Sequence, residues 1–503
     1  MMTRRLIQTS ALVLGATTIY KVLGLVEKLA LAHFFGTGAA ADAYLAGAGV
    51  VLLVGWLLAD VAGPALIPVL LHDPANARNT LGAALGWTLA VVLPLVALGW
   101  FGAGGLARVF GPGFDSATLQ MTAGVIRVGI LALPLVCVTI LLSVWYQTHQ
   151  RFVRPTLADI WLKIGPLIGI ATLGGLRGLA WGLVGGAVVR LAMLLGRDVP
   201  LHPHLRRDAG LARALRGGWP LFVTALVSVH LIGVIETALA STLGTGAVAA
   251  LAYARRVVDV PVILAPQIVA RVVFPTLTTL ALAQNTTALA VLLRSCIRLT
   301  MLAFLPLTII GMLLARPLVQ LLFERGAFDA RSVADTSAAM LAIMPGLPAL
   351  ALSVLLVRFN YATGDTRRPS VIRVLGAVTQ IGLALWWRRW GLAGLGWATT
   401  VSLWLETIAL VWAARVAIGA PRSFDWAWWS KIALAAGGCA AVVGWGWWLL
   451  PQPTSALANL GRIAALTLVG CAAYGTILLA SSVFRFQHLR QLIVAANYKE
   501  NPF

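Results

Sequence analysis

Long apolar segments recur from one end of this 503-residue chain to the other, and they constrain its fold more than any other feature. Each is about 20 residues or longer, the length that an α-helix needs to cross a hydrocarbon core of about 30 Å. Hydrophobic residues make up 60% of the chain and charged residues 11%, and an ordinary soluble domain cannot bury so much apolar surface. The pattern predicts an all-α integral membrane protein, because helices satisfy their own backbone hydrogen bonds in lipid.

The segments predict about fourteen membrane helices. The expected ranges are 6–36, 42–71, 80–106, 119–147, 154–173, 177–196, 214–243, 247–283, 287–315, 331–361, 368–388, 391–416, 428–450 and 458–482. An even number places both termini on one side of the membrane. Basic residues are concentrated in the loops on that side, which predicts cytoplasmic termini and explains the net charge of +21 without a nucleic-acid partner.

One short motif occurs twice. "GTGAAADAYLA" (residues 36–46) joins the first two expected helices, and "GTGAVAALAYA" (residues 244–254) joins the seventh and eighth. Six helices separate equivalent positions, so both copies enter the membrane in the same direction. Two six-helix lobes related by a pseudo-two-fold axis along the membrane normal are therefore expected, with a substrate site at their interface, as in alternating-access transporters. The expected parts are an N-lobe (1–196), a cytoplasmic linker (197–216), a C-lobe (217–416) and two extra helices with a cytoplasmic tail (417–503).

The four helices that flank the repeated motif carry most of the intramembrane charge. Such residues are costly in lipid and usually face a cavity or a partner. The basic ones are Lys21, Lys28, Arg255, Arg256 and Arg271, and the acidic ones are Glu27, Asp42, Asp60, Glu236 and Asp259.

Two interpretations of these charges stay open. A central cavity lined by the basic residues would suit an anionic ligand, and phosphate in particular, because a guanidinium donates two parallel hydrogen bonds. Alternatively, the acidic residues pair with the basic ones and hold helices together. Spacing of four residues favours local ion pairs between Arg255 and Asp259 and between Asp159 and Lys163.

Other signals of chemistry are weak. His202 and His204 lie two residues apart with no further ligand nearby, and the four cysteines are scattered through apolar segments, so neither a metal site nor a disulfide framework is expected. No nucleophile with an adjacent base and no phosphate-binding glycine loop is recognisable. We therefore expect a transporter without cofactor rather than an enzyme. We also expect a monomer. The nineteen tryptophans cluster at expected helix ends, where indole rings anchor helices at membrane interfaces.

Three motifs carry a family resemblance: "KVLGLVEKLALAHFFGTGAAADAYLA", "LLFERGAFDA" and "YATGDTRRPSVI". The chain resembles the MurJ (MviN) family, the lipid II flippases of bacterial peptidoglycan synthesis, within the multidrug/oligosaccharidyl-lipid/polysaccharide exporter superfamily. The resemblance implies a bacterial inner-membrane location and the two-lobe architecture. It also implies that the last two helices form a groove for a polyprenyl tail. The implied substrate is a polyprenyl diphosphate bearing a sugar-peptide head group.

The resemblance also extends to individual residues. Lys21 takes the position of the family's basic residue before "VLG", and Arg256 matches an essential arginine that is followed by Asp259 and Pro261. Asp42 matches the acidic residue after the first turn motif, and Asp60 stands where the family usually has a glutamate. These matches imply that Lys21 and Arg256 contact the diphosphate.

The chain departs from the family pattern in two helices. Glu27 and Lys28 reverse the family's order of arginine and aspartate, and Gly55 and Trp56 replace its arginines in the second helix. Lys28 or Arg271 would have to supply the missing positive charge. The departures keep a flippase for another polyprenyl-diphosphate-linked oligosaccharide open as an alternative. A cation-coupled drug exporter and a non-transporting scaffold are further alternatives, and coupling to membrane potential, protons or sodium is left open.

Overall fold

The computed structural model describes residues 2–196, 199–262, 274–365, 367–419, 425–451 and 455–481. Within these ranges every regular element is a helix and no strand occurs, which confirms the predicted all-α class. Ten of the described helical stretches, or up to eleven if one bent pair counts as a span, are long and apolar enough to cross a membrane. The expected number of fourteen is not confirmed. One of the ten candidates, Arg367–Ala417, contains two helices that pack against each other.

The chain divides into two compact units. Unit 1 consists of Met1–Tyr253 and Arg325–Ser332, and unit 2 consists of Ala254–Glu324 and Val333–Phe503. The central boundary falls inside helix α12 (Ala247–Val262). The lobe boundaries inferred from the repeated motif stay predictions.

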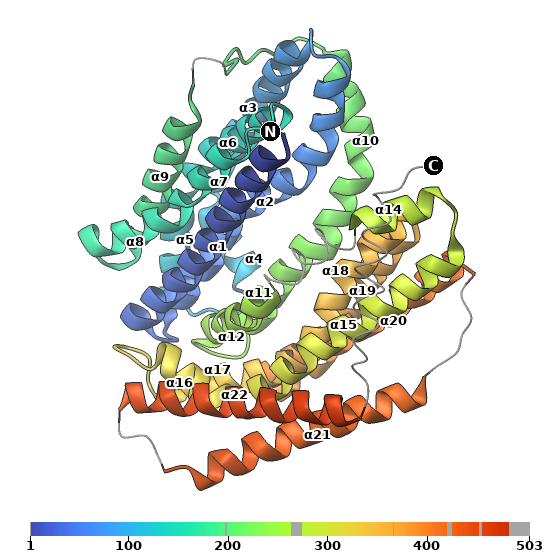
Figure 1. Ribbon diagram of the computed structural model, residues 1–503. Helices are drawn as coiled ribbons and strands as arrows, with labels where there is room; N and C mark the ends of the chain where they lie inside the picture. The colour runs from blue at the N-terminus through green and yellow to red at the C-terminus, as the bar shows by residue number, and fades with distance from the viewer. Residues whose placement is uncertain are drawn as a thin grey trace. The chain divides into compact units, whose positions relative to one another are not determined.

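Unit 1 is a bundle built around α2 (Figure 1). Its helices are α1 (Met2–Phe35), α2 (Ala39–His72), α3 (Ala77–Phe101), α4 (Ala103–Phe110), α5 (Ser116–Gly129), α6 (Ala132–Thr148), α7 (Val153–Asp159), α8 (Trp161–Leu173), α9 (Gly175–Leu194), α10 (Ala209–Ala225), the π-helical turn η1 (Leu226–Leu231), α11 (Ile232–Ser241) and the start of α12. Helix α2 packs against α5, α6 and α10. The main buried cluster joins α2, α3, α6 and α9, where Leu81, Leu142 and Ala187 are completely buried.

Glycines bring α8 and α9 into close contact. A Cβ atom added to Gly169 would lie 2.0 Å from the carbonyl oxygen of Gly178, and one added to Gly165 would lie 2.2 Å from that of Gly182. The four-residue spacing of these glycines places them on one face of each helix. Small residues at such spacing let helix backbones approach closely in membranes, where van der Waals packing replaces the hydrophobic effect between helices.

The segment between α9 and α10 runs along the start of α3. The backbone N–H of His204 donates to the carbonyl of Gly82 over 3.1 Å. The hydroxyl of Thr80 donates to Asp208 over 2.9 Å, and Asp208 also caps α10 by accepting from the backbone N–H of Leu211. The described part of the predicted linker, from residue 199, is therefore fastened to unit 1.

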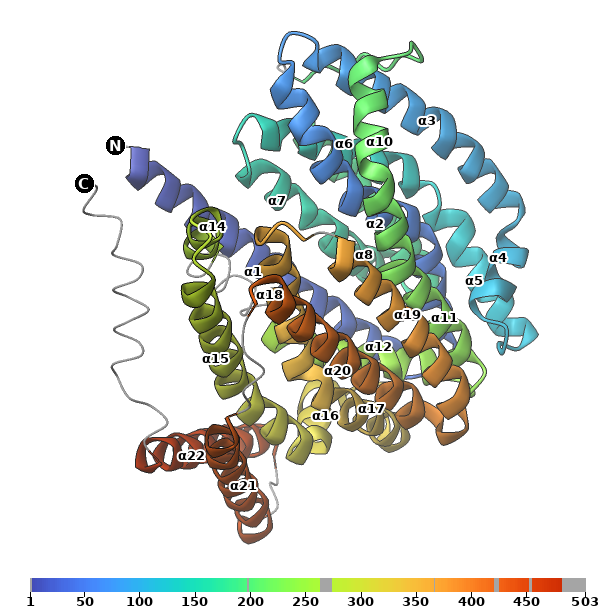
Figure 2. The same cartoon turned by 90° about the vertical axis from the view of Figure 1, so that its right-hand side faces the viewer.

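Unit 2 has a larger group of helices and a final pair, α21 and α22, that packs against it (Figures 1 and 2). Its helices after α12 are α14 (Phe274–Leu282), α15 (Thr286–Leu313), α16 (Ala315–Phe323), α17 (Ala330–Ile343), η2 (Met344–Gly346), α18 (Leu347–Ala362), α19 (Arg367–Trp387), η3 (Arg388–Trp390), α20 (Gly391–Ala417), α21 (Trp426–Leu449) and α22 (Ala456–Ala480). Helix α18 packs against α15 and α20, and α19 packs along α20. The core includes Leu314, Leu356 and Cys439, all completely buried.

The last two helices, α21 and α22, pack on each other and on α15 and α16. Asp425 caps α21 and binds the guanidinium of Arg298 on α15, which also lies 5.1 Å from the ring centre of Trp428. Near the other end of the pair, the buried guanidinium of Arg462 lies 3.7 Å from the ring centre of Trp447 and donates to its carbonyl. Each of the two arginines, Arg298 and Arg462, therefore contacts an indole ring and also binds an oxygen near a helix end.

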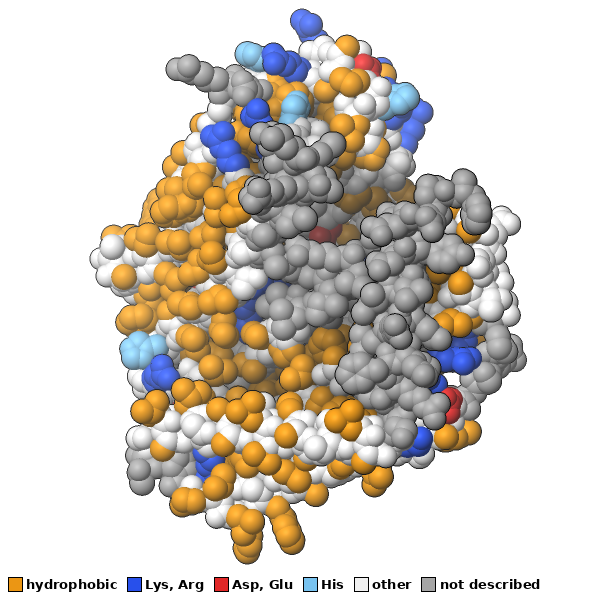
Figure 3. All heavy atoms as spheres, in the orientation of Figure 1, with side chains coloured by type: hydrophobic (Ala, Val, Ile, Leu, Met, Phe, Trp, Pro, Cys, Tyr) orange, Lys and Arg blue, Asp and Glu red, His pale blue; other side chains and the backbone are white. Residues whose placement is uncertain are grey.

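The surface of unit 1 has two kinds of region (Figure 3). Hydrophobic side chains cover the sides of the helices in this view. Leu98 and Phe101 on α3 are among the exposed apolar residues of unit 1. Lys, Arg and His side chains gather at the end where α2 ends and α3 and α10 begin. This distribution is typical of helices that cross a bilayer and place their charged ends among lipid head groups.

Candidate functional site

The two copies of the repeated motif meet within unit 1. Asp42, which is completely buried at the start of α2, accepts hydrogen bonds from the backbone N–H groups of Gly246 and Ala249, over 2.6 Å and 2.7 Å. These N–H groups belong to the first turn of α12 and its preceding turn, where helix geometry leaves donors without partners. The hydroxyl of Tyr253 donates to the carbonyl of Gly36 over 3.0 Å. Each copy of the motif therefore satisfies backbone groups of the other.

Gly246 is required for this approach. Its φ angle is +91°, and an added Cβ would lie 2.0 Å from the carbonyl oxygen of Thr37. Both the left-handed backbone conformation and the lack of space exclude other residues. The second glycine of "GTG" thus keeps the turn close enough for Asp42 to bind it.

A third motif, "FERGAFDA", joins the same place. The N–H of Ala327 donates to the carbonyl of His33 over 2.9 Å, and the hydroxyls of Thr37 and Ser332 lie 2.7 Å apart. Asp329 accepts from the backbone N–H and the hydroxyl of Ser332, and these bonds lower the pKa of Asp329 below its usual value. We call residues 36–42, 244–253 and 325–332 the turn cluster. It connects three sequence motifs in one hydrogen-bonded structure.

Glu27 on α1 is held by a residue that the sequence analysis did not place with it. Its carboxylate is 6% exposed and lies 2.8 Å from Nζ of Lys163 on α8 and 3.5 Å from Nζ of Lys28. The predicted local pairing of Asp159 with Lys163 is replaced, because Asp159 binds Arg190 on α9 over 2.6 Å. A buried carboxylate such as Glu27 needs a cation at close range, and α8 packs against α1. A lone lysine within an apolar helix is the signal that marks Lys163.

Asp60 on α2 and His230 in η1 form another contact between helices. Nε2 of His230 lies 3.0 Å from a carboxylate oxygen of Asp60, and the imidazole is 7% exposed. The contact joins α2 to the π-helical turn in the seventh expected helix. Such turns are rare and are frequently found at functional sites. Glu236, one turn and a half further on, is buried in α11.

The basic residues of α12 beyond Tyr253 belong to unit 2. Arg255 donates to the hydroxyl of Thr399 on α20 over 3.0 Å, and Gln380 on α19 donates to the same oxygen over 3.2 Å. Arg255 is therefore bound to α20, at a hydroxyl that α19 also contacts. Arg256 is half-buried, and Asp259 is exposed.

The remaining predicted site residues stay predictions. Lys21 is half-buried on α1. Arg271 lies outside the described residues. Among the described residues, no group of three or more His, Cys, Asp or Glu side chains is arranged to hold a metal ion.

The packing around α2 explains one departure noted in the sequence. Gly55 is buried, and an added Cβ would lie 2.8 Å from Cγ1 of Val136 on α6. An arginine at position 55 would require α2 and α6 to separate. Trp56, at the next position, is 48% exposed, so only this second position has room for a long side chain.

Comparisons with known proteins agree on one family. The model of the family described as "Lipid II flippase MurJ" matches residues 31–467. A probable lipid II flippase MurJ of Vibrio cholerae is 26% identical over 81% of this chain and 82% of its own length. The lipid II flippase MurJ of Burkholderia cenocepacia is 26% identical over 79% of this chain and 81% of its own length.

Solved structures show the same fold. A structure of lipid II flippase MurJ in an inward closed conformation aligns with a TM-score of 0.81 at 18% identity, covering 95% of this chain and all of the other. An inward-facing multidrug transporter of the MATE family aligns less closely, with a TM-score of 0.67 over 80% of this chain and 94% of the other. Since the family model matches most of the chain, the protein belongs to the MurJ family of lipid II flippases.

Proposed function

We propose that this protein is a flippase that moves lipid II, the lipid-linked peptidoglycan precursor, from the inner to the outer leaflet by alternating access. The family match across residues 31–467 carries this proposal. The described charges support it, because the four helices next to the repeated motif hold basic residues suited to an anionic diphosphate. The protein is a transporter and needs no catalytic residue for this task.

The diphosphate contacts are assigned to Lys21 and Arg256. Lys21 stands at the position of the family's basic residue before "VLG", and Arg256 matches the family's essential arginine, which supports this assignment. Arg271 lies outside the described residues and is kept as a further contact. Arginine suits this role because its planar fork matches phosphate oxygens.

The turn cluster is the proposed gate of the transport cycle. Alternating access requires the two membrane faces to open in turn, and the turn cluster ties together the junctions of helices one and two and of helices seven and eight. Asp42 is the principal gate residue, because it accepts two hydrogen bonds from the start of α12. Asp60, Glu236 and Asp259 are the other acidic residues assigned to gating or to balancing charge within the cavity.

The topology completes the proposal. Fourteen membrane helices with both termini in the cytoplasm fit the concentration of basic residues. Helix α1 adds to the ten candidate spans, one of the ten is itself the two helices α19 and α20, and the bent pair α5 and α6 forms a further span. The eighth expected helix, 247–283, includes residues outside the described ranges. The N-lobe and C-lobe form the transport pathway, and α21 and α22 accommodate the polyprenyl tail. The location is the bacterial inner membrane.

Growth complementation tests the function. Bacteria depleted of their own lipid II flippase receive this protein or Arg256→Ala, with membrane levels measured by immunoblot. We expect growth with the unchanged protein and loss of growth with Arg256→Ala. Lys431→Ala, a loss of charge at the start of α21, is the matched control and should support growth.

Each outcome decides between specific alternatives. No growth with well-expressed, correctly inserted protein would contradict lipid II transport and favour another lipid-linked oligosaccharide. Growth with Arg256→Ala would leave lipid II transport standing and remove Arg256 from the diphosphate site.

A further inference from the structure

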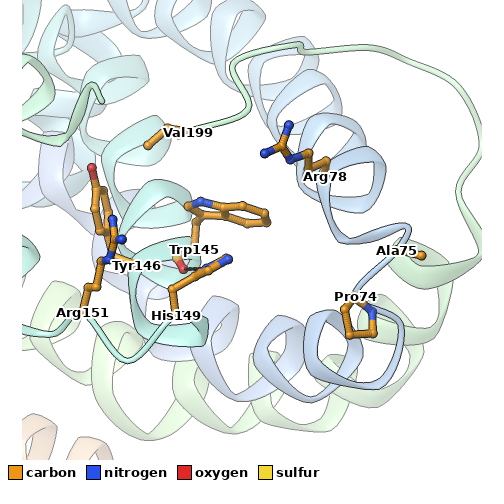
Figure 4. Close-up of a pocket in the computed structure, with 8 residues that line it drawn as sticks. All are labelled: Pro74, Ala75, Arg78, Trp145, Tyr146, His149, Arg151 and Val199. Carbon is orange, nitrogen blue, oxygen red and sulfur yellow. Dashed lines mark hydrogen bonds between the residues drawn. The ribbon is translucent and has the colours of Figure 1, made fainter. Parts of the chain in front are cut away.

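A cavity opens at the end of unit 1 where α2 ends and α3 begins (Figure 4). Its volume is about 360 Å³, and three separate segments line it. Pro74, Ala75 and Arg78 come from the α2–α3 junction, and Val199 comes from the segment that precedes α10; the end of α6 contributes Trp145, Tyr146, His149 and Arg151. Ligand cavities in proteins start at about 300 Å³, so a small head group would fit this one.

The wall of the cavity is basic and aromatic. Arg78 and His149 extend from opposite sides toward the indole of Trp145, and Arg151 lies beside Tyr146 (Figure 4). None of the eight described residues that line the cavity is acidic. Nδ1 of His149 lies 2.9 Å from the carbonyl oxygen of Trp145, which can only accept, so this nitrogen carries a proton.

The aromatic part of the wall is held in place. Trp145 and Tyr146 are buried, and the Trp145 ring lies 4.4 Å from the imidazole of His149. The hydroxyl of Tyr146 donates to the carbonyl of Leu194 over 3.0 Å. Arg154 packs over the Tyr146 ring and donates to the carbonyl of Met193. The cavity is therefore preformed, and ligand binding would cost little ordering of these groups.

We propose that this cavity binds the phosphate of an anionic phospholipid head group. Basic pockets at the ends of membrane helices recognise such head groups, and Trp and Tyr side chains sit at the same depth of the bilayer. Helix α2 ends and α3 begins beside the cavity, and α6 ends there as well. The cavity is too small for acyl chains, but Leu71, three residues before the lining residue Pro74, is an exposed apolar residue near the end of α2.

The site is distinct from the proposed diphosphate site, whose residues lie on α1 and α12. Bound lipid would contact the α2–α3 junction, the end of α6 and Val199 together. It would thus fasten the segment that leads into α10 to the rest of unit 1. The proposal does not depend on which lipid-linked substrate the protein transports.

Lipid titration followed by native mass spectrometry tests the proposal. Full-length protein in detergent is titrated with phosphatidylglycerol or with zwitterionic phosphatidylcholine, and the adducts are counted. We expect one phosphatidylglycerol to bind at least about tenfold more tightly than phosphatidylcholine. Arg78→Gln/Arg151→Gln should remove this preference. The matched control, Arg207→Gln/Arg216→Gln, loses the same charge from exposed positions that do not line the cavity and should change the affinity less than about twofold.

Three results would overturn the proposal. The first is equal affinity of the unchanged protein for the two lipids, and the second is an equal loss in both double variants. The third is binding of inorganic phosphate that Arg78→Gln/Arg151→Gln abolishes, without any preference between the lipids, which would assign the cavity to a soluble anion. Elution volume and melting temperature verify that each variant is folded, and all substituted arginines are exposed.

Discussion

Asp42 shows how one side chain can join two halves of a chain. Its two oxygens accept backbone N–H groups from the second copy of the motif that contains it. The equivalent position in the second copy is Ala250, so the repeat is asymmetric at the position that forms the bond. A buried carboxylate with two charge-assisted hydrogen bonds can stabilise a helix N-terminus, because the helix dipole favours negative charge there.

We expect Asp42→Ala to reduce stability by about 2–4 kcal/mol, because two buried N–H groups lose their acceptor. Asp42→Asn keeps one acceptor oxygen and should lose less. Chemical unfolding of the protein in detergent, followed by tryptophan fluorescence, measures the difference. Thr37→Ala, which removes one hydroxyl contact in the same cluster, is the control and should cost less than either. Equal stability of Asp42→Ala and the unchanged protein would contradict the capping role.

Glu27 and Lys163 show how the structure accommodates an acidic residue where the family pattern has a basic one. An acidic residue on α1 is buried against a lysine on α8, so the helix carries Glu27 without an unpaired buried charge. The nearby pair of Asp159 and Arg190 joins α7 to α9 in the same way.

Exchanging the charges of Glu27 and Lys163 should restore the stability that either single substitution removes. Glu27→Lys and Lys163→Glu each place like charges together and should destabilise the protein, whereas the double variant should recover most of the loss. A double-mutant cycle measured by thermal unfolding should give a coupling energy of about 1–3 kcal/mol. Lys28→Glu combined with Glu27→Lys is the comparison, and its coupling should be smaller because that pair is 3.5 Å apart. Additive single effects would show that the Glu27–Lys163 contact contributes nothing.

At the scale of helices, small residues determine which elements pair. Helices α8 and α9 approach through glycines on both sides, and α10 approaches α2 at Gly218, where an added Cβ would lie 3.0 Å from Cβ of Ala65. Such positions can be read from a sequence as glycines four residues apart. Their partners cannot, because many glycine pairs in this chain have the same spacing.

Gly182→Ala should disrupt the pairing of α8 with α9. The added methyl group would lie 2.3 Å from the carbonyl oxygen of Gly165, so the helices must separate and lose their contacts. We expect a lower melting temperature and less folded protein in the membrane. Gly185→Ala on the same helix is the control, because nothing lies within 4 Å of the added atom. The control should be neutral or slightly stabilising, since alanine favours helices. Similar melting temperatures for the two variants would rule out close packing as the role of Gly182.

At the scale of the whole molecule, the proposed transport cycle requires the turn cluster to open. The cluster connects segments that are far apart in the chain, and the hydroxyls of Thr37 and Ser332 lie 2.7 Å apart within it. A covalent bond at this position would keep the cluster closed and stop the cycle.

Thr37→Cys/Ser332→Cys should therefore make transport sensitive to oxidation. The exposed Cys471 is replaced by serine, while the three other cysteines are buried. We expect an oxidant to abolish lipid translocation in proteoliposomes and a reductant to restore it. The two single-cysteine variants should stay active throughout. Full transport after complete cross-linking, verified by mass spectrometry of peptides, would show that the turn cluster does not need to open.

The amino-acid sequence by itself determined the class of this protein. Apolar segment length dictates membrane helices, because backbone groups in lipid must be satisfied within the helix. The repeated motif and the "FERGAFDA" and "GDTRRP" motifs were sufficient to recognise the family. Gly55 and Trp56 could be recognised as departures, but only packing against Val136 explains why position 55 is small.

Only the tertiary structure decided which charges and polar groups meet. Lys163 binds Glu27, far away in the chain, because an ion pair depends on the distance between helices and not on their separation in sequence. The partners of Asp42 are backbone N–H groups, which every residue except proline possesses and which therefore leave no mark in the sequence. Sequence indicates where the apolar helical segments lie, whereas the chemistry of the turn cluster and of the cavity arises where separate helices end side by side.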